Sequence, residues 1–213
     1  MKSIVIWGIG GHAREVAQLV ADIEAHQPGS WALQGFLVDK DATTQHPKAL
    51  PAPLLGGLEW RVAHPEVWLV VAVGNPKLRR QIAERLLDAN PQAQFATLVH
   101  PTAWVVPSAQ VGAGSVVFAK TCVSDQVQIG QHASINLACT LSHDTVLGDF
   151  VSLGPGVNLC GGVNVASHCE LGAGTTVLPN VQIHSGVMVG AGAVVTRSLA
   201  EGVTAVGVPA RAK

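Results

Sequence analysis

A repeat of six residues runs through the second half of the chain and limits what it can fold into. Every sixth position from Val99 to Val195 is Val, Ile or Leu. A second column, four residues further on, holds only small or β-branched residues from Ala103 to Ala193. Three hexapeptides, each one short strand and one turn, make a triangular coil of about eighteen residues, which is the signature of a parallel β-helix. The large aliphatic side chains then stack inside the prism.

The regularity of the repeat predicts the extent of the prism. No insertion breaks the register between residues 99 and 199, so we expect roughly five to six coils without a large loop. An antiparallel meander with fortuitous spacing is the alternative interpretation. The flat faces of such prisms commonly pack around threefold axes, and we therefore predict a homotrimer.

The N-terminal part of the chain follows a different pattern. Short apolar runs at 3–8, 31–39 and 67–75 predict buried strands. Amphipathic segments at 8–25 and 76–90, one led by glycines and one by proline, predict helices. Strands that alternate with helices indicate a small parallel sheet of the Rossmann type.

Ligands of such sheets bind beyond the carboxyl ends of the strands. Three strand ends meet there, at Gly8–His12, at Asp39 and at Gly74–Asn75. The loop GIGGHA and the helix that follows it present backbone N–H groups suited to a diphosphate. An NAD site expects an acid about twenty residues after this loop, and Asp39 comes later than that. We interpret the edge as a sugar or nucleotide site, with a dinucleotide site or a purely structural turn as alternatives.

Composition argues against several classes of protein. The net charge of -1 gives no reason to expect nucleic acid or an anionic membrane as a partner. No apolar run reaches about 18 residues, and the first one contains glycine and ends in His and charges, so we expect a cytoplasmic protein. The cysteines Cys122, Cys139, Cys160 and Cys169 lack CxxC spacing, and we interpret them as small buried hydrophobes.

These motifs together resemble those of one family. GIGGH at 8–12, AVGN at 72–75, NLACTLSHDTVLGDF at 136–150 and GVPAR at 207–211 are similar to the motifs of bacterial sugar acyltransferases. That family includes sialic-acid O-acetyltransferases and N-acetyltransferases of nucleotide-linked amino sugars. The likeness covers nearly the whole chain. It implies a left-handed β-helix, acetyl-CoA as co-substrate, a sugar as acceptor, no metal, and active sites between the subunits of a trimer.

The resemblance also implies roles for individual residues. His143 matches the general base of the family, and Asp144 matches the acid that raises its basicity. Contacts with the nucleotide sugar are implied for Gly10, Gly11, His12, Asp39, Gly74, Asn75 and Asn136. Contacts with acetyl-CoA are implied for Gly161, Ala173, Ala191, Pro209 and Arg211. The expected division is a Rossmann-like domain, a β-helix and a tail that contacts the cofactor, at residues 1–92, 93–199 and 200–213.

Two positions depart from the family's pattern. Some members carry a second histidine that contacts the cofactor nine residues after the base, where this chain has Ser152. Several nucleotide-sugar members carry two adjacent acids after the second strand, and Val38 replaces the first of them here. The resemblance thus implies a cofactor contact at the position of Ser152, and Val38 leaves the nucleotide base open.

The residue types suit acetyl transfer from a thioester. A histidine has its pKa near working pH, and a carboxylate partner fixes its tautomer and stabilises the imidazolium. A backbone N–H, such as that of Gly161, is suited to stabilise an oxyanion. Thiolate is a good leaving group, so we expect direct transfer in a ternary complex without a metal.

Other classes of protein fit parts of the sequence. Prism-shaped carbonic anhydrases bind zinc through three histidines, and His132 and His168 have the spacing of the first two, but Ala173 stands at the third position. A non-catalytic scaffold that binds sugar nucleotides is favoured by Ser152 and opposed by the intact His-Asp pair. Among enzymes, the Rossmann-like pocket favours N-acetylation of a nucleotide-linked amino sugar over O-acetylation of sialic acid.

Overall fold

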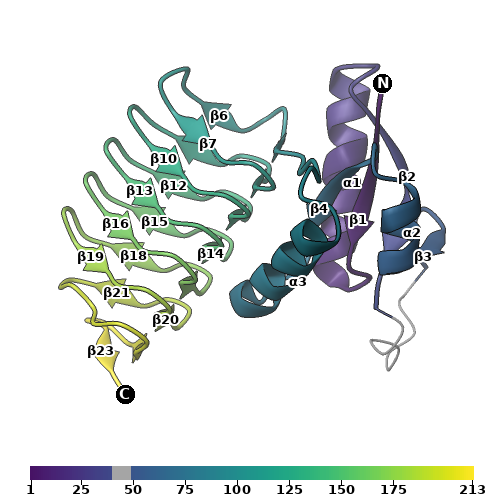
Figure 1. Cartoon of the computed structure of the whole chain (residues 1–213). Coiled ribbons are helices and arrows are strands. Elements are labelled where there is room, and N and C mark those ends of the chain that lie inside the picture. Colours follow the sequence, from purple (N-terminus) through teal and green to yellow (C-terminus); the bar gives the residue numbers. More distant parts are fainter. Residues whose placement is uncertain (40–48) are drawn as a thin grey trace.

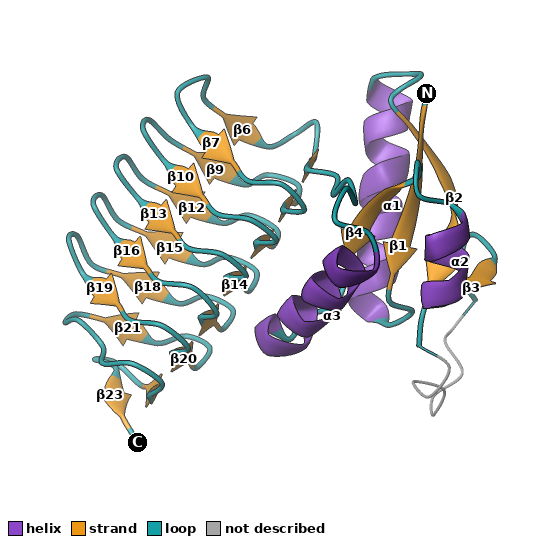
Figure 2. Cartoon of the chain, in the orientation of Figure 1, coloured by secondary structure: helices purple, strands orange, loops and turns teal. Residues whose placement is uncertain are grey.

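The computed structural model describes residues 1–39 and 49–213, which form two units lying side by side (Figures 1 and 2). The N-terminal unit is a small parallel sheet with helices around it. The C-terminal unit is a prism of stacked coils, the left-handed parallel β-helix. The expected fold class is therefore confirmed.

The N-terminal sheet is parallel throughout and has the order β3-β2-β1-β4. Its unit contains β1 (Lys2–Trp7), α1 (Gly11–His26), β2 (Trp31–Leu37), β3 (Leu54–Gly56), α2 (Leu58–Ala63), β4 (Trp68–Val71) and α3 (Pro76–Ala89). The central strand β1 is an apolar run because both of its faces are covered. The sequence did not predict β3 and α2, since three-residue and six-residue elements show too little periodicity.

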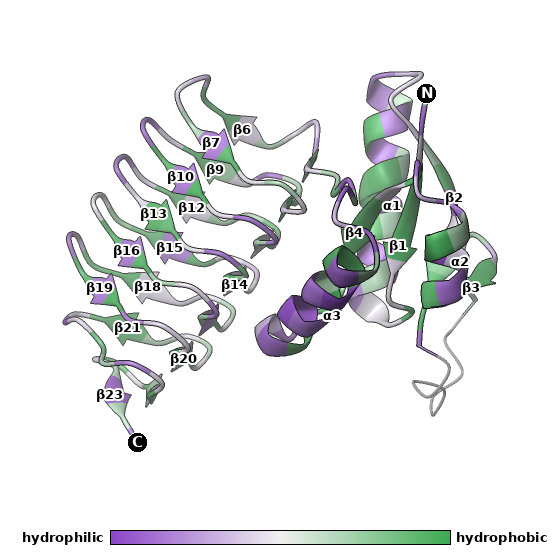
Figure 3. Cartoon of the chain, viewed as in Figure 1, coloured by the Kyte–Doolittle hydropathy of each residue, from purple (hydrophilic) through white to green (hydrophobic). Residues whose placement is uncertain are grey.

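The helices that flank this sheet begin at the two predicted loops. α1 buries one stripe of small and aliphatic side chains, including Val16 and Val20. α3 has Pro76 in its first turn, and the Asn75 side chain accepts a hydrogen bond from the backbone N–H of Leu78 at 2.9 Å, an N-cap that satisfies one free donor of the helix. β1 is hydrophobic, whereas α3 shows a largely hydrophilic surface (Figure 3).

Three parallel sheets form the walls of the prism. The eight-stranded sheet contains β5 (Leu98–Val99), β8 (Val116–Val117), β11 (Ser134–Ile135), β14 (Ser152–Leu153), β17 (Glu170–Leu171), β20 (Met188–Val189), β22 (Thr204–Val206) and the antiparallel β23 (Arg211–Ala212). The six-stranded sheet contains β6 (Trp104–Val105), β9 (Cys122–Val123), β12 (Thr140–Leu141), β15 (Asn158–Leu159), β18 (Thr176–Val177) and β21 (Val194–Val195). The five-stranded sheet contains β7 (Gln110–Val111), β10 (Gln128–Ile129), β13 (Val146–Leu147), β16 (Asn164–Val165) and β19 (Gln182–Ile183).

Both columns of the repeat fill the interior of the prism, as predicted. The aliphatic column from Val117 to Val195 is buried. Polar members of the second column donate to a carbonyl of the next coil: the Thr121 hydroxyl to Asn136 at 2.8 Å and the Cys139 thiol to Gly154 at 3.2 Å. Burial raises the pKa of Cys139 to about 11. Each inward polar group is thus satisfied inside an apolar core, and this thiol has a structural role.

The three corners of the prism are named by the sheets that they join. The eight–six corner includes residues 137–138, 155–156, 173–174 and 191–192. The six–five corner includes residues 125–126, 143–144, 161–162 and 179–180. The five–eight corner includes residues 131–132, 149–150, 167–168 and 185–186. One residue in several of these turns has a positive φ, as at Asp144 and Phe150.

The N-terminal unit packs against the eight-stranded sheet and the five–eight corner. The apolar stripe of α1 shares one core cluster with Leu98, Val116 and Phe118 of the first coils. At the corner, the His132 ring stacks on Phe150 with ring centres 5.0 Å apart, and Phe150 stacks on His168 at 5.5 Å. The six–five corner does not border the covered sheet.

Candidate active site

The histidine and aspartate of the predicted catalytic pair lie in the turn between β12 and β13, on the six–five corner. Asp144 has φ 60°, a left-handed conformation that Asp tolerates better than most residues. Its carboxylate lies 2.8 Å from Nδ1 of His143, and both side chains are about two-thirds exposed. If Nδ1–H donates to the carboxylate, Nε2 carries the lone pair and is free to accept a proton.

A glycine on the next coil lies directly beneath this imidazole. A Cβ placed on Gly161 would lie 2.6 Å from Nε2 of His143 and 2.5 Å from its Cε1, so only glycine allows the ring to lie in this position. The Gly162 N–H donates to the carbonyl of His143 at 2.9 Å. The Gly161 N–H makes no hydrogen bond within residues 1–39 and 49–213. A basic nitrogen and a free backbone donor therefore lie next to each other.

The glycine loop after β1 is shaped by a close backbone approach. Gly8 has φ 125°, and a Cβ there would lie 2.8 Å from the carbonyl oxygen of Ala72, so the position requires glycine. Gly10 has open space around it, and as the N-cap of α1 it supplies no side-chain hydrogen bond. The first turn of α1 contains no acidic residue. Gly10 and Gly11 thus leave helix N–H groups available to an anion.

His12 lies at the start of α1 where the two units meet. Its Nε2 is 3.3 Å from the hydroxyl of Ser134 on β11, and its Nδ1 is 3.4 Å from the carboxylate of Glu15. The ring also contacts that of Phe118, with centres 5.7 Å apart. Burial, together with the positive charge of Arg79, lowers the pKa of His12 below its usual value. A neutral His12 at the prism surface is suited to hydrogen bonding.

A buried arginine that was not predicted from the sequence holds the loop after β4. Arg79 on α3 is 2% exposed, and it donates to the carbonyl oxygens of Val73 at 2.7 Å and Gly74 at 3.0 Å. Burial lowers its pKa to about 10, so the guanidinium stays charged at neutral pH. Its position on the buried stripe of α3, between Pro76 and Ile82, was the only signal in the sequence.

Ser152 lies next to this loop. Its hydroxyl donates to the carbonyl oxygen of Gly74 at 3.0 Å and accepts a hydrogen bond from Nη2 of Arg79 at 2.9 Å. The family pattern implied a cofactor contact at this position. In the structure its side chain bonds to Gly74 and Arg79 of the N-terminal unit.

Asp39 lies at the carboxyl end of β2, beside the glycine loop, as expected for a parallel sheet. Its carboxylate pairs with the Arg85 guanidinium at 2.8 Å, and that guanidinium lies 5.3 Å from the centre of the Trp7 ring. The three predicted strand ends therefore lie along one edge of the sheet. The side-chain oxygen of Asn75, at the third strand end, caps α3.

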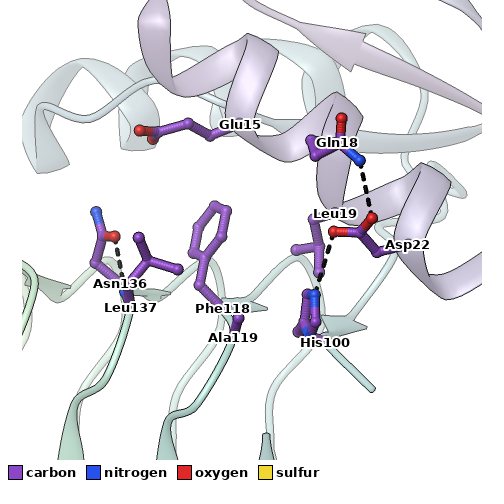
Figure 4. Close-up of a pocket in the computed structure, with 9 residues that line it drawn as sticks. All are labelled: Glu15, Gln18, Leu19, Asp22, His100, Phe118, Ala119, Asn136 and Leu137. Carbon is purple, nitrogen blue, oxygen red and sulfur yellow. Dashed lines mark hydrogen bonds and ion pairs between the residues drawn. The ribbon is translucent and has the colours of Figure 1, made fainter. Parts of the chain in front are cut away.

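Asn136 borders a small cavity between α1 and the prism (Figure 4). The cavity measures about 160 Å³, with Glu15, Gln18 and Asp22 on the side of α1. Phe118 and Leu137 line the opposite side. The side-chain oxygen of Asn136 accepts a hydrogen bond from the Leu137 N–H at 2.7 Å, which leaves its amide group as a free donor toward the cavity.

The predicted residues fall into two groups that a single chain keeps apart. His143, Asp144 and Gly161 are on the six–five corner, across the prism from the N-terminal unit. Asn136 ends a strand at the eight–six corner, which also carries Ala173 and Ala191. Pro209 and Arg211 lie past the last coil, where β23 pairs with β22.

Three further observations bear on other interpretations of the sequence. Within residues 1–39 and 49–213, no group of three or more His, Cys, Asp or Glu side chains could hold a metal ion. The Phe150 ring lies between those of His132 and His168, so these two rings belong to an aromatic stack. In the same part of the chain, no helix is long and apolar enough to cross a membrane.

Comparison with known proteins places these features in a family. Residues 3–86 match the model of the PglD N-terminal domain. The chain is 36% identical over 120 residues to the UDP-N-acetylbacillosamine N-acetyltransferase of Bacillus subtilis (strain 168). That match covers 56% of this chain and 52% of the relative, so it spans only about half the length of the curated relative.

Several solved structures match the whole chain, among them two that hold coenzyme A or acetyl coenzyme A. PerB from Caulobacter crescentus, in complex with CoA and GDP-perosamine, is 32% identical with a TM-score of 0.87, and the match covers 100% of this chain and 98% of PerB. The acetyltransferase domain of PglB from Neisseria gonorrhoeae FA1090, in complex with acetyl coenzyme A, is 31% identical with a TM-score of 0.87 and coverage of 100% and 99%.

Fold, site and matches together define an acyltransferase of the left-handed β-helix class. More narrowly, the chain belongs to the bacterial hexapeptide-repeat sugar acyltransferases, the family with a PglD-type N-terminal domain.

Proposed function

We propose that the protein transfers an acetyl group from acetyl-CoA to the amino group of a nucleotide-linked amino sugar. The observation that carries this proposal is the coverage of the match to PerB, whose structure holds CoA and GDP-perosamine. The match includes both units of this chain, and thus both the loops at the sheet edge and the His-Asp pair on the prism.

The residues on the six–five corner suit direct transfer. The amine nitrogen attacks the thioester carbonyl and forms a C–N bond, and Nε2 of His143 takes the proton that the amine loses. Asp144 orients the ring through Nδ1 and stabilises the imidazolium. The free N–H of Gly161 is the donor for the oxyanion. The C–S bond then breaks, and coenzyme A leaves as the thiolate, which is protonated to the thiol.

The sheet edge of the N-terminal unit suits the nucleotide diphosphate. Gly10 and Gly11 leave free N–H groups at the start of α1, and neither α1 nor α3 has an acid in its first turn. Arg79 adds a buried positive charge. In the described part of the chain, no carboxylate lies within ion-pair distance to neutralise it. These features favour a phosphate-bearing ligand over free sialic acid. Asp39 and Gly74–Asn75 border the same edge.

The positions of the two groups support a cyclic trimer. The six-stranded sheet runs from the eight–six corner to the six–five corner. Its outward column, Trp104, Cys122, Thr140, Asn158, Thr176 and Val194, is uncharged. If three copies turn this face toward a common axis, the six–five corner of each chain meets the eight–six corner of its neighbour. His143 and Gly161 of one chain then meet Asn136, Ala173 and Ala191 of the next.

The acetyl-CoA contacts in this arrangement come from both chains. Gly161 comes from the six–five corner, whereas Ala173 and Ala191 come from the eight–six corner of the neighbour. Pro209 and Arg211 of the exposed C-terminal segment lie beyond the last coil, at the C-terminal end of the prism. The small size of the two alanines leaves room for a long, thin ligand along the corner.

Release of coenzyme A tests the proposal. Acetyl-CoA is mixed with a panel of UDP-, GDP- and dTDP-linked amino sugars and with free sialic acid, and the thiol product is measured with a thiol reagent. We expect release with one nucleotide-linked amino sugar and a loss of roughly 10²- to 10⁴-fold in kcat for His143→Ala. Release with sialic acid alone would establish O-acetylation instead. Absence of release across the panel would favour a scaffold that binds without catalysis.

A further inference from the structure

The resemblance implied a cofactor contact at the position of Ser152, whereas the structure shows its hydroxyl bonded to Gly74 in the loop after β4. We infer that Arg79 and Ser152 form one positioning unit, which fixes the Gly74–Asn75 loop against the prism and so sets the affinity for the nucleotide rather than for acetyl-CoA. The inference about ligand affinity rests on the proposed function.

Every nitrogen of the Arg79 guanidinium donates hydrogen bonds. Nε donates to the carbonyl of His132 at 2.8 Å, and Nη1 donates to Val73 and Gly74. Nη2 donates to the carbonyls of Phe150 at 3.0 Å and Val151 at 3.3 Å and to the Ser152 hydroxyl. All five N–H donors therefore have partners. Some partners belong to the loop after β4 and the others to two neighbouring coils of the prism, so one buried side chain links the two units.

The contact with Ser152 closes a ring of three hydrogen bonds. The carbonyl oxygen of Gly74 accepts from both Arg79 and Ser152, each at 3.0 Å, while Ser152 accepts from Arg79 at 2.9 Å. The loop carbonyl is thus held from two directions. A lysine at position 79 would supply one point charge and could not reproduce this geometry.

The same wall of the prism holds the other ligand loop. Ser134 and Ser152 are register partners on β11 and β14. Ser134 lies 3.3 Å from Nε2 of His12 at the end of the glycine loop, and Ser152 bonds to Gly74. Two serines one coil apart therefore contact the two loops that border the sheet edge. The same wall also leads to Phe118 and Asn136, which line the cavity between α1 and the prism, so the two loops have a fixed place relative to that cavity.

The variant Ser152→Ala distinguishes a role of this serine in nucleotide binding from a role in coenzyme A binding. Binding of UDP, GDP, dTDP and coenzyme A is measured by calorimetry for the wild type and the variant, and hydrogen exchange is followed across residues 74–78, where every residue except Pro76 has an amide hydrogen. We expect roughly five- to tenfold weaker binding of the nucleotide, in line with the loss of one hydrogen bond, unchanged binding of coenzyme A, and faster exchange in the loop. Ser152→Thr keeps the hydroxyl and is expected to restore both readouts.

Ser185→Ala is the matched control. Its hydroxyl bonds to the Ser167 carbonyl at 2.9 Å, within the prism, so its loss should change neither nucleotide binding nor exchange at residues 74–78. Weaker coenzyme A binding by Ser152→Ala with unchanged nucleotide binding would overturn the inference and assign Ser152 to the cofactor.

Hydrogen exchange tests, without any ligand, whether Arg79 and Ser152 fix the Gly74–Asn75 loop. If the wild type binds none of the three nucleotides, the proposed substrate class fails, but the loop remains measurable. Faster exchange at residues 74–78 in Ser152→Ala then supports the positioning unit, whereas unchanged exchange overturns it.

Discussion

Nε2 of His143 lies 2.6 Å from where a Cβ on Gly161 would be. The two residues are on successive coils, and the Gly162 N–H donates to the His143 carbonyl, so the backbone fixes their separation. The absence of a side chain at residue 161 is therefore part of the catalytic geometry that we propose.

Gly161→Ala should lower kcat roughly ten- to hundredfold, because the methyl group displaces the imidazole and covers the N–H beneath it. Steady-state coenzyme A release measures the loss. Pro179→Ala, on the same corner one coil further, is the control and should keep full activity. Equal activity of Gly161→Ala and wild type would show that this contact does not matter to the reaction.

Asp144→Ala should lower kcat less than His143→Ala does, since the base is still present and its orientation and imidazolium stabilisation are weakened. The same assay gives the ratio. Thermal unfolding should change little, because both side chains of the pair are about two-thirds exposed. A loss as large as that of His143→Ala would assign Asp144 a more direct part in proton transfer.

Two inactive variants should restore activity when they are refolded together. One carries His143→Ala, and the other carries His12→Ala with Asn136→Ala. If each site takes its base from one chain and its acceptor contacts from the next, about a quarter of the sites in a random mixture are intact. We expect roughly that fraction of wild-type activity, with analytical ultracentrifugation to confirm the trimer. No recovery would place the complete site within one chain.

Stability should fall as the pH is lowered from about 6.5 toward 4. Burial, with the nearby charge of Arg79, lowers the pKa of His132 to about 4, so the unfolded chain binds a proton that the folded chain does not. Stability is then complete above the unfolded pKa and decreases below it, by on the order of 3 kcal/mol at pH 4 for this group. Denaturant unfolding across this range measures the slope.

The variant His132→Asn should flatten that slope. Asn tolerates the left-handed backbone of this position, where φ is 52°, and it does not titrate. His12 and His168 also have lowered pKa values because of burial, so part of the acid sensitivity should remain. An unchanged slope would mean that His132 is not neutral in the fold.

The prism was predictable because its core repeats with a period of six residues, which is typical of a parallel β-helix. Each hexapeptide contributes its own inward residues, so the columns from Val99 and Ala103 could be read without knowing any contact. The strand ends of the N-terminal sheet were predictable for a similar reason, since Gly8 and Gly74 follow buried apolar runs.

What the sequence could not indicate depends on contacts between distant segments. Arg79 occupies one position of an amphipathic helix, and nothing local distinguishes a buried arginine from an exposed one. The bond from Ser152 to Gly74 joins residues 78 positions apart. Likewise, the separation of His143 from the N-terminal unit follows from which corner each turn occupies, a property of the closed coil and not of either motif.

Each strand of a wall pairs with the strand one full coil later, as Gln128 does with Val146 and Val146 with Asn164. This pairing limits how such a chain can change in length. Insertion or deletion of one whole coil keeps every later side chain on its own wall and only lengthens or shortens the column. Loss of a single hexapeptide upstream of the base would rotate everything after it by one third of a turn. The imidazole would then lie on a different edge from the one that meets a neighbouring chain in the proposed trimer. Natural variation in this half of the molecule is therefore expected to occur in whole coils.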